Sequence, residues 1–154
     1  MEDIGYFMEK KRRLILLMSS VLALFAGALC YYMFRNSNII FFQLFKIKIT
    51  HANIRLADNF ITSFIKYNLC DGLWLLSGIL FLRFLWFNNP AIGAHYITVF
   101  IGVALLLELL QLTDYFPGTF DIVDIFTMAL CALLEHCINY ILPHRRRQKW
   151  VKIG

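Results

Sequence analysis

Residues 108–124 read ELLQLTDYFPGTFDIVD, and this stretch decides how the rest of the chain is interpreted. It places four carboxylates and the amide of Gln111 between two very apolar segments. Near its centre, Pro117 and Gly118 are the pair favoured at the two central positions of a type II turn. The stretch therefore predicts a hairpin of two membrane helices, with a tight turn and an acidic cluster at one face of the bilayer.

The composition indicates a membrane protein. Of the 154 residues, 60% are hydrophobic and 16% are charged, and the mean hydropathy is +0.64. An average soluble domain is roughly 45 to 50% apolar. We therefore predict an all-α integral membrane protein.

Four apolar runs have the length of about 20 residues that a transmembrane helix needs. They cover residues 14–34, 69–87, 91–112 and 121–142. There is no internal repeat and no low-complexity tract. The sequence therefore predicts one membrane domain over residues 1–154 with four transmembrane helices.

Basic residues predict the orientation of these spans. Residues 10–13 read KKRR directly before the first span, and residues 145–152 carry five Lys and Arg after the last one. The positive-inside rule then places both termini in the cytoplasm, in agreement with an even number of spans. The net charge of +5 is explained by this topology and by anionic inner-leaflet lipid. Without a soluble basic domain, we expect no nucleic-acid binding.

The first span carries two further patterns. A basic start, an apolar core and Ala26-Gly27-Ala28 imitate a cleavable signal peptide, but the apolar run continues through Phe34 and favours an uncleaved span. Ser19, Ala23 and Gly27 are spaced four residues apart. Small residues at this spacing allow membrane helices to approach closely.

The segment between the first two spans mixes apolar and polar residues too finely to cross a membrane. Apolar residues recur at helical spacing from Asn53 to Lys66, which predicts an amphipathic helix in the outer interface with Arg55 and Lys66 among the headgroups. An ordered loop packed on the helix bundle is the alternative. The segment is long enough to cover the acidic cluster.

The predicted topology brings the acidic residues of three helices to the outer face. The residues expected there are Asp71, Glu108, Gln111, Asp121 and Asp124. Acids inside or at the edge of a membrane helix indicate a functional site. The alternative is structural: Asp71, Asp121 and Asp124 sit at helix starts, where acids favour the helix dipole and cap backbone N–H groups, and Glu108 hydrogen-bonds across the hairpin. Capping does not explain Glu108, which lies inside an apolar run.

Two oppositely charged residues fall at similar depths on different spans. Arg83 lies about 18 Å along the second span from Asp71, and Glu135 lies about 21 Å from Asp121 on the fourth. We expect them to pair, which offsets the cost of burying either charge alone. Extension of Arg83 to the cytoplasmic interface is the alternative.

The four cysteines do not have the spacing of a metal site. Cys131, His136 and Cys137 fall within an apolar helix, where such residues usually pack or make hydrogen bonds. Cys30 and Cys70 are both expected near the outer face, so the sequence leaves a disulfide between them open.

The acidic stretch resembles a known family signature. Glu108 and Gln111, followed by Phe116-Pro117-Gly118-Thr119-Phe120-Asp121 and then Asp124, are similar to the signature of the VanZ-like family. These are small bacterial multi-helix membrane proteins named after a teicoplanin-resistance protein. The similarity covers the third and fourth spans and extends to Asp71-Gly72-Leu73-Trp74 in the second. It implies a helix bundle in the bacterial cytoplasmic membrane with a role in the cell envelope, but it implies no particular reaction.

Three functions fit these observations. In the first, an acidic extracytoplasmic pocket binds an envelope lipid or a lipoglycopeptide-like amphiphile, through its carboxylates or through a divalent metal, and the protein so contributes to antibiotic resistance. In the second, the protein is an enzyme that modifies an envelope lipid, with one carboxylate as general base. In the third, it is a structural subunit of an envelope complex. The sequence indicates no resident cofactor and leaves the oligomeric state open.

Overall fold

The computed structural model describes residues 2–34, 59–113 and 120–141 of the chain. Within these ranges it contains five helices and no strand. The helices are α1 (Glu2–Phe34), α3 (Phe60–Tyr67), α4 (Leu69–Leu85), α5 (Pro90–Leu110) and α6 (Ile122–Ile141). The predicted all-α fold is confirmed for this part of the chain.

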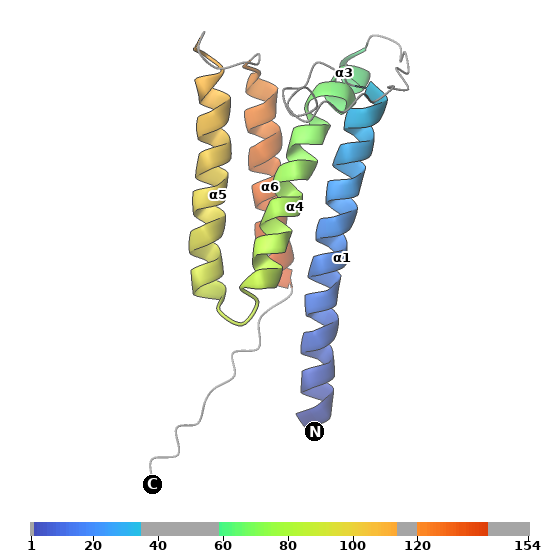
Figure 1. Ribbon diagram of the computed structural model, residues 1–154, viewed down its shortest axis with the longest axis vertical. Coiled ribbons are helices and arrows are strands. Elements are labelled where there is room, and N and C mark those ends of the chain that lie inside the picture. The colour runs from blue at the N-terminus through green and yellow to red at the C-terminus, as the bar shows by residue number, and fades with distance from the viewer. Residues whose placement is uncertain (1, 35–58, 114–119, 142–154) are drawn as a thin grey trace, which may run out of the picture.

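Four long helices lie side by side, and the short α3 lies across one end of them (Figure 1). α4 and α6 run in the same direction, and α5 runs in the opposite one. The start of α1 and the end of α6 are therefore at the end of the bundle away from α3. This arrangement brings the start of α4, the end of α5 and the start of α6 together.

Two helices, α1 and α5, are long and apolar enough to cross a membrane. A third candidate span is the pair of α3 and α4, which are bent by 48° relative to one another. These results, which cover only the described residues, agree with a membrane protein.

Two helix starts differ from the prediction. α1 starts at Glu2 rather than near Leu14, because Lys and Arg are good helix formers and nothing before the apolar run stops the helix. α3 starts at Phe60 rather than Asn53, because Asn59 has an extended backbone and caps the helix. The Asn59 side chain accepts a hydrogen bond from the Thr62 backbone N–H at 2.9 Å, and the Thr62 hydroxyl accepts one from the Asn59 backbone N–H. Residues 53–58, including Arg55, lie outside the described ranges, as does the predicted Pro117-Gly118 turn.

α1 packs on α4 through small residues, as predicted, but with Ser20 rather than Ser19 at the contact. Ser20 donates to the Ser77 carbonyl and Ser77 donates to the Ser20 carbonyl, both at 3.0 Å. Ala23 and Gly27 continue the same buried row. Spacings of three and four residues keep this row on one face of the helix.

α4 also packs closely on α6 at one glycine. A Cβ atom on Gly72 would lie 2.5 Å from Thr127 Cγ2, so a larger residue there would push the two helices apart. The core beside it contains Leu75, Ile79 and Met128. This close packing fixes the start of α4 against the start of α6, where the acidic residues lie.

Candidate functional site

Asn68 joins two of the predicted acidic residues. It lies between α3 and α4 and is 4% exposed. Its side-chain amide nitrogen donates to Asp124 Oδ1 at 2.7 Å and to Asp121 Oδ2 at 3.2 Å. Hydrogen bonds to ionised groups are shorter and stronger than neutral ones. The amide therefore holds the two carboxylates of α6 against the start of α4.

Glu108 faces the start of α6 from the last turn of α5. Its side chain is 5% exposed. Glu108 Oε2 accepts from the Gln111 side-chain amide at 3.0 Å, and Oε1 accepts from the Asp121 backbone N–H at 3.4 Å. These donors explain how a carboxylate is accommodated in this apolar helix, because a buried charge needs hydrogen-bonding partners.

Asp121 has both of the roles considered from the sequence. Asp121 Oδ1 accepts from the Val123 backbone N–H at 2.9 Å, so the residue caps α6 as predicted. Its other oxygen accepts from Asn68, and its backbone N–H donates to Glu108. A capping account alone therefore does not describe these contacts.

In the structure, the acidic cluster consists of five residues: Asn68, Glu108, Gln111, Asp121 and Asp124. Four of these five residues were predicted as site residues. Glu108, Asp124 and Asn68 are buried, whereas Asp121 and Gln111 are only partly buried. The cluster therefore has a buried inner part and a partly exposed outer part.

Two other predicted site residues have different outcomes. Asp71 lies in the first turn of α4, one turn after Asn68, and is partly buried. It is therefore at the same end of the bundle as the cluster. Arg55 lies outside the described ranges.

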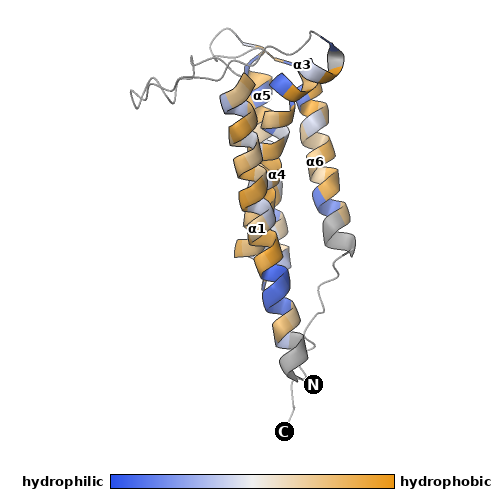
Figure 2. Ribbon diagram, turned by 90° about the vertical axis from the view of Figure 1, so that its right-hand side faces the viewer, coloured by the Kyte–Doolittle hydropathy of each residue, from blue (hydrophilic) through white to orange (hydrophobic). Residues whose placement is uncertain are grey.

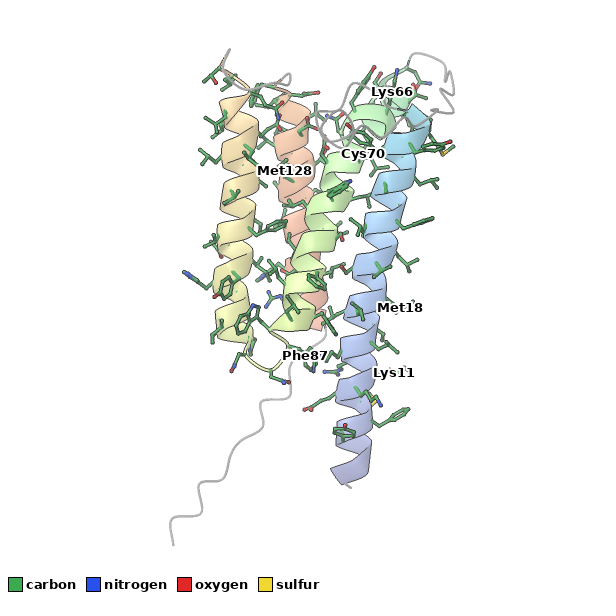
Figure 3. All side chains as sticks on the ribbon, in the orientation of Figure 1. Lys11, Met18, Lys66, Cys70, Phe87 and Met128 are labelled. Carbon is green, nitrogen blue, oxygen red and sulfur yellow. The ribbon has the colours of Figure 1, made fainter. Side chains whose placement is uncertain are left out.

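Among the described residues at this end of the bundle, acidic side chains outnumber basic ones. Among the basic residues that the structure describes, Lys66 is the one at this end, and its Nζ lies 4.9 Å from the centre of the Tyr67 ring (Figure 3). The other basic residues of the described ranges are Lys10, Lys11, Arg12, Arg13 and Arg83, towards the opposite end. Excess negative charge attracts a cationic group.

The described residues do not support the metal that was considered for this site. No group of three or more His, Cys, Asp or Glu side chains in those ranges is arranged to hold a metal ion. The amide of Asn68 instead supplies donors to two of the carboxylates.

The predicted ion pair is present near the other end of the bundle. Arg83 Nε donates to Glu135 Oε1, and the two side chains are 12% and 7% exposed. α4 and α6 are therefore joined by polar contacts near both ends, with Gly72 and Thr127 packed between them. No disulfide joins Cys30 and Cys70, the pair that the sequence left open.

Asn68 was missed as a site residue by the sequence reasoning. The sequence placed it at a helix start, as one of several turn-forming residues before Gly72. The only available signal was its position one turn before Asp71.

Comparisons of the chain with protein-family models, with curated proteins and with solved structures gave no match.

Proposed function

We propose that the chain is a four-span protein of the bacterial cytoplasmic membrane, of the VanZ-like type, with the acidic cluster at its extracytoplasmic face. The support for this topology is the basic segment at residues 10–13, at the end of the bundle opposite the cluster. In Figure 2 this segment is the hydrophilic band on the lower part of α1. Basic segments are retained on the cytoplasmic side.

The proposed function is to bind the cationic group of an amphiphile from the cell envelope, such as a lipoglycopeptide. The observation that carries it is that the end of α5 and the start of α6 place three carboxylates together, two of them buried. A cationic group binding there gains charge-assisted hydrogen bonds. The apolar part of the ligand remains in the bilayer.

The outer part of the cluster makes the first contact in this proposal. Asp121 and Gln111 are only partly buried, and Asp121 Oδ2 already accepts a hydrogen bond from Asn68. A ligand ammonium group has three donors and competes with the Asn68 amide for these oxygens. Glu108, behind Asp121, adds negative charge that strengthens this contact.

Substitution of Glu108 tests the proposal in cells. Glu108→Gln keeps the shape and the hydrogen-bonding capacity but removes the charge. We expect the full-length wild type to raise the inhibitory concentration of a lipoglycopeptide for a Gram-positive host several-fold, and Glu108→Gln to remove this effect at unchanged membrane abundance. The measurement is the inhibitory concentration, with the abundance read by immunoblot.

Glu9→Gln is the matched control because it makes the same chemical change on α1, at the end of the bundle away from the acidic cluster. It should keep the wild-type protection. If Glu108→Gln and Glu9→Gln protect equally well, the cluster is only a structural contact between helices.

A further inference from the structure

α1 extends past the rest of the bundle at the end away from the acidic cluster (Figure 1). Arg13 marks where this extension starts, because its guanidinium carbon lies 5.0 Å from the centre of the Phe84 ring, in the last turn of α4. In Figure 3, Lys11 lies at a similar level along the bundle as Phe87, which follows α4. The residues before Lys11 therefore project beyond the other helices.

This extension exposes large apolar side chains beside positive charges. Tyr6 and Phe7 are 66% and 67% exposed, and Met8 is 48% exposed. Lys10 and Lys11 are exposed as well. An apolar patch that projects from the bundle and is bordered by charged residues, here Glu9, Lys10 and Lys11, is typical of a surface that binds something else.

The position of this patch matches the headgroup layer of a bilayer. Phe7 lies about 9 Å beyond Arg13 at 1.5 Å per residue. The headgroup layer on each side of the hydrocarbon core is roughly 5 to 8 Å thick. Aromatic residues favour this layer, and basic residues there bind anionic lipids. With Arg13 placed at the edge of the hydrocarbon core, Lys10 and Lys11 lie within this layer and Phe7 lies at its outer limit.

We propose that Tyr6, Phe7, Lys10 and Lys11 form a binding surface for anionic phospholipids. The lysine ammonium groups contact the lipid phosphate, and the two rings, farther out along α1, pack among the outer parts of the headgroups. Charge complementarity selects an anionic lipid over a zwitterionic one. The positive-inside rule requires only charge, whereas this surface also uses exposed rings. The proposal does not depend on the function of the acidic cluster.

The test compares two lipids around the full-length chain in nanodiscs. Spin-labelled phosphatidylglycerol and phosphatidylcholine are added separately, and electron paramagnetic resonance measures the fraction of each that is immobilised by the protein. We expect the wild type to prefer phosphatidylglycerol. Each lysine contributes up to about fivefold to this preference, so Lys10→Gln with Lys11→Gln should bring it close to one.

Lys66→Gln is the matched control because it removes one positive charge at the opposite end of the bundle. It should keep the preference, and circular dichroism should show unchanged helix content in all variants. Equal immobilisation of both lipids by the wild type would overturn the proposal and would indicate that the patch binds another partner. An equal loss in Lys66→Gln and in the variant with both Lys10→Gln and Lys11→Gln would also overturn it, since any surface lysine would then serve.

Discussion

Glu135→Ala is expected to destabilise the helix bundle by about 3 to 5 kcal/mol, because it leaves the Arg83 charge without its partner inside the bundle. The free energy of unfolding of the full-length chain is measured by SDS titration in mixed micelles. The loss of a few van der Waals contacts alone would cost much less than this.

A double variant separates the ion pair from packing. Arg83→Met with Glu135→Leu replaces both charges by apolar groups, and it should recover most of the stability that Glu135→Ala loses. Such a recovery is expected for a buried ion pair, because the double variant leaves no charge without a partner. An unfolding free energy for Glu135→Ala within about 0.5 kcal/mol of the wild type would show that water reaches Arg83, as surface substitutions have effects of that size.

The second large effect is expected at Asn68. Asn68→Leu removes the amide that donates to Asp121 and Asp124 and leaves two carboxylates short of a donor, one of them 8% exposed. An unsatisfied buried acceptor costs about 1 to 3 kcal/mol, and more when it is charged. We therefore expect a loss of about 2 to 4 kcal/mol in the same unfolding measurement.

Asn89→Leu is the control for this substitution. Asn89 precedes α5, is exposed, and its side chain makes no capping hydrogen bond. Its replacement should change the unfolding free energy by less than about 0.5 kcal/mol. Similar losses in Asn68→Leu and Asn89→Leu would show that the Asn68 contacts contribute nothing specific.

Much of the helical arrangement could be predicted from the sequence. The bounds predicted at 69–87, 91–112 and 121–142 agree to within two residues with the helices α4, α5 and α6. Of these helices, α5 alone is long and apolar enough to cross a membrane by itself, and α4 is so together with α3. Their ends follow from long apolar runs bounded by residues that cap or stop helices, such as Pro90 and Asp121. The depth arithmetic also found the pair of Arg83 and Glu135, because two ideal helices of known direction fix the height of each residue.

The start of α1 and the contacts of Asn68 could not be predicted. The apolar run sets where a membrane span starts but does not stop a helix that continues through basic residues, so α1 is longer than its predicted span. The contact of Asn68 with Asp121 crosses 53 residues of sequence. It depends on the packing of α4 on α6 at Gly72, which periodicity does not reveal.

A binding measurement is the most direct test of the claim that the acidic cluster recognises a cationic group. The measurement is the dissociation constant of a lipoglycopeptide with a free amino group, and of its N-acetylated form, for the full-length chain in nanodiscs. We predict that wild type binds the amine form roughly tenfold more tightly or better, as for a charged hydrogen bond, and that Glu108→Gln removes most of this difference. Equal affinities of the wild type for both forms would contradict the account.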